Sequence, residues 1–175
     1  CDLIYARIRA ETARAEWAVL ILDASTLETL ATKGTHVVQC ALRYVLDNAI
    51  VERAVGVVEL SSDDAGGHLK AVVQCLNRIF VGEKAETYFE GVLRVVYSTV
   101  GNPFSQVTDG TRDCLCTKLL ALSSDDASVL TGHRSGLLSL LRDFRHTVIT
   151  EGPVQELFAL VDGAHKLQSA LGDAK

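Results

Sequence analysis

Apolar residues recur at spacings of three and four positions along most of the chain, and this period predicts α-helices. Only two prolines, Pro103 and Pro153, interrupt the pattern, and both follow turn-forming residues. The predicted helices cover about residues 2–22, 26–33, 35–60, 63–80, 89–100, 114–122, 137–148 and 154–171. The pattern therefore predicts an all-α fold of about eight or nine helices joined by short connections.

Length and composition indicate one folded unit. Because ordinary domains have about 100–150 residues, the 175 residues predict a single all-helical domain over 1–175. The hydrophobic content of 48% excludes intrinsic disorder as the main state, and no apolar run is long enough to span a membrane as a helix. The chain contains no methionine and begins with Cys1, so we expect it to be a segment or a processed form of a longer protein.

Two segments resemble each other at an offset of 35 residues. Residues 37–46 read VVQCALRYVL, and residues 72–81 read VVQCLNRIFV. A period of about 35–45 residues with two helices per unit resembles the HEAT and armadillo families of α-helical repeats. The resemblance implies a solenoid-like scaffold, and an irregular multi-helix bundle remains the alternative. The second repeated string, LSSDDA at 60–65 and 122–127, has a different offset and does not fit this period.

Charge and cysteine content narrow the class of partner and the compartment. The formal net charge is −5, and the basic residues are scattered among acidic ones, as in the Arg7–Glu11 pair at helical i,i+4 spacing. This distribution disfavours nucleic acid, which requires a basic surface. A chain of this length can build a core without disulfides, so the five cysteines are expected to be reduced and mostly buried, in an intracellular, reducing compartment.

Candidate chemistry is sparse, and the sequence predicts no catalytic, cofactor or metal site. Cys40 and Cys75 lie in apolar patterns where thiols are usually inert, and Cys114-Leu115-Cys116 lacks the usual zinc-ligand spacing. The pairs Asp63-Asp64 and Asp125-Asp126 follow serines, a pattern more typical of helix starts than of cation sites.

The sequence thus predicts a non-catalytic α-helical scaffold or adaptor that binds protein partners within a larger assembly. Trp17, the single tryptophan, is the candidate interface anchor, or else packs between helices. The alternative is a compact helical bundle that binds a small apolar ligand or cofactor, and a cysteine-dependent enzyme ranks last.

Overall fold

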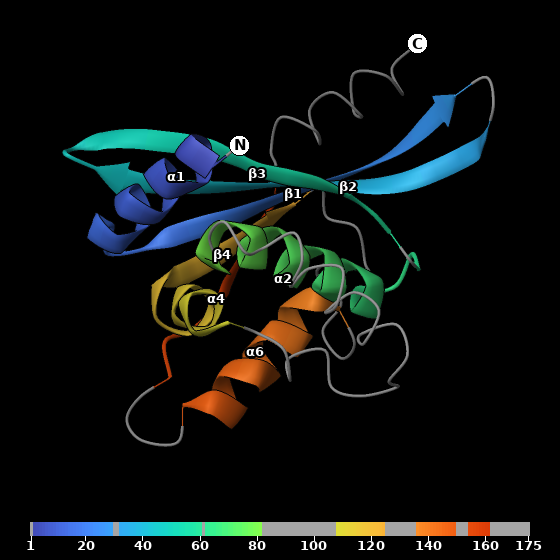
Figure 1. Cartoon of the computed structure of the whole chain (residues 1–175). Helices are drawn as coiled ribbons and strands as arrows, with labels where there is room; N and C mark the ends of the chain where they lie inside the picture. The colour runs from blue at the N-terminus through green and yellow to red at the C-terminus, as the bar shows by residue number, and fades with distance from the viewer. Residues whose placement is uncertain are drawn as a thin grey trace, which may run out of the picture.

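The computed structural model of the chain contains a five-stranded mixed sheet (Figure 1). The residues that it describes are 2–29, 32–60, 62–81, 108–124, 136–149 and 154–161. An antiparallel meander is formed by β1 (Ala18–Thr29), β2 (Thr32–Leu46) and β3 (Ala49–Glu59). Next to β1 lies β4 (Leu119–Ser124), which runs parallel to it, and β5 (Phe158–Val161) runs parallel to β4, giving the order β3-β2-β1-β4-β5.

The described helices pack on one side of this sheet (Figure 1). They are α1 (Asp2–Arg14), α2 (Ala65–Val81), α4 (Asp109–Asp113) and α6 (Leu137–Val148), and a π-helical turn, η2 (Cys114–Lys118), leads directly into β4. Helix α2 lies against the sheet, and α6 packs against α2. None of the described helices is both long enough and apolar enough to cross a bilayer.

The core lies between α2 and the strands β1 to β3. Alternate residues of each strand point toward the helices, as the two-residue period of a strand requires. On β2 these are Val38, Cys40, Leu42 and Tyr44, each at most 2% exposed. They meet the apolar face of α2, which is formed by Leu69, Val72, Cys75, Leu76 and Ile79. Sheet and helices therefore share one continuous apolar core.

The predicted all-α fold is wrong, and so are the helical repeat, the bundle alternative and the resemblance to the HEAT and armadillo families. The helix predicted over 2–22 ends at Arg14 and is followed by β1, and the region predicted as helices over 26–33 and 35–60 forms β1, β2 and β3. The segment 114–122 is η2 followed by β4, and β5 lies within 154–171. Helices α2 and α6 confirm two of the predicted helices, whereas 89–100 lies outside the described residues.

The repeated VVQC string adopts two different structures. At 37–40 it belongs to β2, where Val38 and Cys40 point inward and Gln39 is exposed. At 72–75 it belongs to α2, where Val72 and Cys75 are fully buried. In β2 the second and fourth residues of the string point toward the core, whereas in α2 the first and fourth residues are fully buried. The same four letters therefore fit either the period of a strand or that of a helix. The shared string is therefore no structural repeat.

Lys118, the last residue of η2, binds the C-terminal end of α1. Its Nζ donates hydrogen bonds to the carbonyl oxygens of Thr12, Ala13 and Ala15 at 2.9, 3.2 and 2.9 Å. Carbonyls at a helix C-terminus lack intrahelical partners and carry the negative end of the helix dipole. A single ammonium therefore satisfies three such acceptors and holds α1 against the rest of the fold.

We expect Lys118→Met to lower the free energy of unfolding by about 1–2 kcal/mol, because charge-assisted hydrogen bonds to these carbonyls are lost. Chemical denaturation monitored by circular dichroism measures the change. Arg112→Met is the matched control, since the Arg112 guanidinium lies 3.8 Å from an exposed Asp109 carboxylate and should contribute little. Equal losses in the two variants would contradict this role for Lys118.

Candidate functional site

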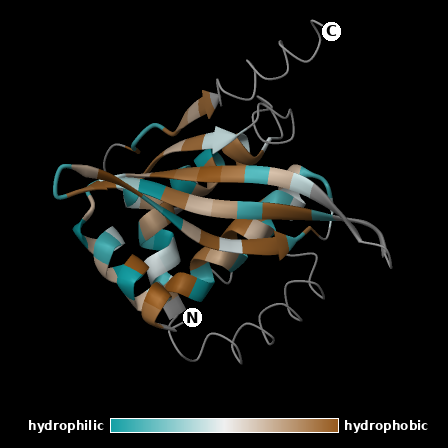
Figure 2. Ribbon diagram, turned by 90° about the horizontal axis from the view of Figure 1, so that it is seen from above, coloured by the Kyte–Doolittle hydropathy of each residue, from teal (hydrophilic) through white to brown (hydrophobic). Residues whose placement is uncertain are grey.

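The side of the sheet away from the described helices is a surface of mixed apolar and polar character. Figure 2 views the molecule from this side and shows that no described helix crosses the strands. We call this surface the open sheet face. Its side chains follow from strand alternation and register: Ile21, Asp23, Gln39, Ala41, Arg43, Val45, Ile50, Glu52, Ala54, Val57, Ser123, Phe158 and Leu160.

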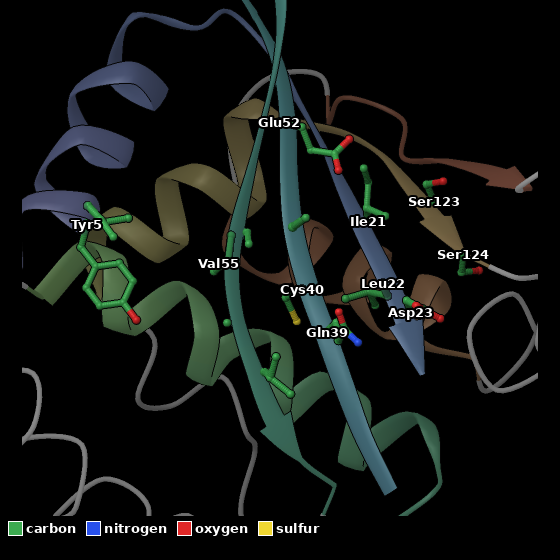
Figure 3. Close-up of a pocket in the computed structure, with 15 residues that line it drawn as sticks. Tyr5, Ile21, Leu22, Asp23, Gln39, Cys40, Glu52, Val55, Ser123 and Ser124 are labelled. Carbon is green, nitrogen blue, oxygen red and sulfur yellow. The ribbon is translucent and has the colours of Figure 1, made fainter. Parts of the chain in front are cut away.

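A hollow with a volume of about 670 Å³ lies on this face (Figure 3). Its floor consists of the central strands, and Tyr5 of α1 lies at its margin beyond β3. Asp23 and Gln39 are register partners on β1 and β2, and Ile21 is the partner of Ser123 on β4. The hollow therefore combines apolar and polar groups, and its lining comes from the consecutive strands β1 to β3, from the remote strand β4 and from α1.

Charged groups on the open sheet face are partly paired. The Arg43 guanidinium donates two hydrogen bonds to the Glu52 carboxylate, at 2.6 and 2.9 Å, between register partners of β2 and β3. Both side chains are half exposed, so this pair contributes little to stability. It places one positive and one negative charge beside the hollow, with the Asp23 carboxylate exposed further along β1.

Two cysteines lie directly behind the floor of the hollow. Cys40 of β2 and Cys75 of α2 are at most 2% exposed, and each thiol shifts the pKa of the other. The interaction with Cys40, assisted by the positive charge of Arg78, lowers the pKa of Cys75 although burial opposes the shift. The pairing with Cys75 and burial together raise the pKa of Cys40 well above its ordinary value.

Comparison with known protein families and with curated proteins gives no match.

The candidate residues predicted from the sequence lie in different parts of the structure. Trp17 lies between α1 and β1 and is 36% exposed, and its role as an interface anchor stays a prediction. Asp64 precedes α2, where its carboxylate accepts a hydrogen bond from the Gly67 backbone N–H at 2.7 Å, which confirms the predicted helix start. Asp125 and Asp126 lie outside the described residues.

The four described cysteines are buried, as predicted, and are free thiols in this structure: Cys40, Cys75, Cys114 and Cys116. However, Cys40 belongs to a strand and not to a helix. Cys114 and Cys116 lie in η2, and burial raises the pKa of Cys114 to about 12. Within the described ranges, no group of three or more histidine, cysteine or acidic side chains is arranged to hold a metal ion.

The open sheet face was not predicted from the sequence because the segments that form β1 to β3 were predicted to be helices. One signal could have revealed part of it: Asp47 and Asn48 have positive φ angles of 51° and 62° and form the two-residue turn between β2 and β3. Asp and Asn tolerate this conformation, and such a pair between β-branched residues is typical of a hairpin. Pairing of β1 with β4 has no comparable local signal.

Proposed function

We propose that this chain is a non-catalytic module that binds a protein partner through the open sheet face, within a larger assembly. The observation that carries the proposal is the set of exposed apolar side chains on a face that no described helix covers. On the β2–β3 hairpin, Ile50 is 77% exposed and Val57 is 54% exposed. Exposed apolar groups that cluster on one surface are typical of interaction sites.

The arrangement of these side chains supports a protein partner more than a small ligand. On this face, apolar groups lie near both edges of the sheet, with Val45, Ile50 and Val57 on β2 and β3 and Phe158 and Leu160 on β5. Polar groups, including the Arg43–Glu52 pair, lie between them. A surface that spans the whole sheet and mixes apolar anchors with paired charges resembles the composition of protein interfaces.

The alternatives of a small apolar ligand and of a cysteine-dependent enzyme receive less support. The hollow is open to solvent and presents the Asp23 and Glu52 carboxylates, whose desolvation would oppose an apolar ligand. For the enzyme, the Cys40 and Cys75 thiols are buried, so a substrate larger than a small oxidant has no access to them. We place the module in a reducing intracellular compartment, a location that the unpaired thiols of the described cysteines support.

The double variant Ile50→Lys/Val57→Lys should weaken partner binding by about tenfold or more, because two charges would be buried against an apolar partner surface. The measurement is quantitative affinity purification of the tagged chain from cells that express it, with partners identified by mass spectrometry. Thermal unfolding of each variant verifies that the fold is kept. We expect one or more proteins to be enriched by the wild-type chain and lost with the double variant.

Leu3→Lys is the matched control, since Leu3 is an aliphatic residue of α1 that is 87% exposed and does not line the hollow. This variant should recover the same proteins as the wild-type chain. If the double variant also recovers them at wild-type levels, the open sheet face is not the binding surface. If the wild-type chain recovers no specific partner, the proposed function itself is contradicted.

A further inference from the structure

Three elements bring the Cys40 and Cys75 thiols together in the core. Cys40 lies on β2 opposite Gly56 of β3, and Cys75 reaches the same place from α2. A Cβ atom at Gly56 would lie only 3.3 Å from the Cys75 sulfur, so the missing side chain of Gly56 leaves room for this sulfur beside the sheet. The Cys75 sulfur therefore lies beside the strand residue that pairs with Cys40.

The surroundings give the two thiols different properties. The interaction with Cys40 and the positive charge of Arg78 lower the pKa of Cys75, whereas the interaction with Cys75 and burial raise the pKa of Cys40. The guanidinium of Arg78 also lies near Gly56, 3.9 Å from the position of a Cβ atom there. Such an environment favours the thiolate, which is the nucleophilic form of cysteine. Cys75 is therefore the thiol prepared to react, and Cys40 is placed to resolve the product.

We propose that Cys40 and Cys75 are a redox-active pair that hydrogen peroxide converts into a reversible disulfide between β2 and α2. The Cys75 thiolate attacks one peroxide oxygen and breaks the O–O bond, which gives a sulfenic acid on Cys75 and, after protonation, one water. The Cys40 sulfur then attacks the Cys75 sulfur, the S–S bond forms, and the sulfenic oxygen leaves as a second water. Two thiols lose two electrons to one peroxide, and two waters result.

The hollow on the open sheet face brings solvent close to the thiol pair. Cys40 and Gly56 both line the hollow, so a small peroxide there lies across β2 and β3 from the two thiols and reaches them when these strands open locally. Cys114 and Cys116 do not line it, and burial raises the pKa of both thiols. Oxidation of the folded chain should therefore be selective for the Cys40–Cys75 pair.

Oxidation would join α2 covalently to the sheet across a segment of 35 residues. A cross-link of this kind reduces the conformational freedom of the unfolded chain. The oxidised protein should therefore unfold at a temperature several degrees higher than the reduced protein. The disulfide would thus hold α2 in its packed position beneath the open sheet face.

The test treats the folded, reduced chain with hydrogen peroxide, blocks the remaining thiols by alkylation and digests the protein without reductant. Mass spectrometry should find the Cys40 and Cys75 peptides joined, with the loss of two hydrogen atoms, and dithiothreitol should separate them. Titration should show that two of the five thiols disappear. Joined peptides that involve any other cysteine, or joined peptides only after denaturation, would overturn the proposal.

Variants distinguish the roles of the two thiols. Cys40→Ala should stop the reaction at a sulfenic acid on Cys75, which dimedone traps, whereas Cys75→Ala should leave Cys40 unoxidised under the same conditions. Cys114→Ala is the control and should keep the Cys40–Cys75 cross-link. The wild-type digestion requires no variant, so the proposal can be refuted even if a substitution prevents folding. Equal dimedone labelling of Cys40 and Cys75 in the single variants would contradict the assigned roles.

Discussion

Arg145→Met should lower the free energy of unfolding by about 3–4 kcal/mol, because three carbonyl groups lose a shared donor in the core. The Arg145 side chain of α6 is only 1% exposed, and its guanidinium donates hydrogen bonds to the carbonyl oxygens of Leu115, Leu119 and Gln155. These carbonyls belong to η2, to the first residue of β4 and to the segment before β5. One side chain thus joins three parts of the fold.

The size of this effect comes from the acceptors that remain after the substitution. Burial lowers the pKa of Arg145 and so opposes its charge, and removal of that charge offsets part of the loss. A methionine fills a similar volume but leaves the three carbonyls without this donor, at about 1–3 kcal/mol for each buried group. Arg145→Lys should recover only part of the stability, since one ammonium cannot reproduce the planar guanidinium geometry.

Urea denaturation of the variants measures these changes, and Arg142→Met is the matched control on the same helix. The Arg142 guanidinium is half-buried and donates to a single acceptor, the carbonyl oxygen of Leu157, at 2.6 and 3.1 Å. We expect Arg142→Met to cost about 1 kcal/mol. If the Met variants at 142 and 145 are equally stable, the three-carbonyl arrangement does not have the importance assigned to it.

The strands were predicted as helices because the apolar residues of β1 lie on both faces of the sheet and those of β2 also match a helical spacing. In β1, Leu20 and Leu22 point to the helices, while Val19 and Ile21 lie on the opposite face and are themselves largely covered. A strand of this kind gives a continuous apolar run, in which helical spacing can be found as easily as alternation. In β2 the alternation was present, with exposed Gln39 and Arg43 between inward residues, but helical matches such as Val38, Ala41 and Val45 concealed it.

Helices α2 and α6 could be predicted because the sequence marks their boundaries and their apolar faces. Asp64 supplies a carboxylate acceptor at the start of α2, and Gly136 precedes α6 with an extended backbone. The candidate site differs, because it depends on long-range pairing. The register of Ile21 with Ser123 places residues about a hundred positions apart side by side, and such pairing is set by the packing of the whole sheet and not by local spacing.

Glu11→Gln should cost about 2–3 kcal/mol at neutral pH, and the loss should depend on pH. The buried Glu11 carboxylate accepts hydrogen bonds from Arg53 at 2.9 and 3.0 Å, from Arg7 at 2.7 Å and from the Tyr44 hydroxyl at 2.7 Å. The interactions with Arg53 and Arg7 hold the pKa of Glu11 at about 2, below its ordinary value of 4.5. The ionised carboxylate thus ties α1 to β2 and β3.

The sign of the pH dependence follows from the lowered pKa. Because the folded chain holds the proton less tightly than the unfolded chain, the stabilisation by Glu11 is fully present above pH 4.5 and is lost as the pH falls toward 2. Over that window the wild-type chain should lose about 1.4 kcal/mol per pH unit relative to Glu11→Gln. Denaturation at pH 7, 5, 4 and 3 measures the difference between the two proteins.

Glu52→Gln is the matched control for this effect. Glu52 also accepts hydrogen bonds from an arginine, but both partners are half exposed, so the cost should be below about 1 kcal/mol at every pH. Burial, and not the presence of an ion pair, then accounts for the contrast between the two glutamates. A Glu11→Gln penalty that is the same at pH 3 and pH 7 would show that the variant acts through packing and not through the ionised carboxylate.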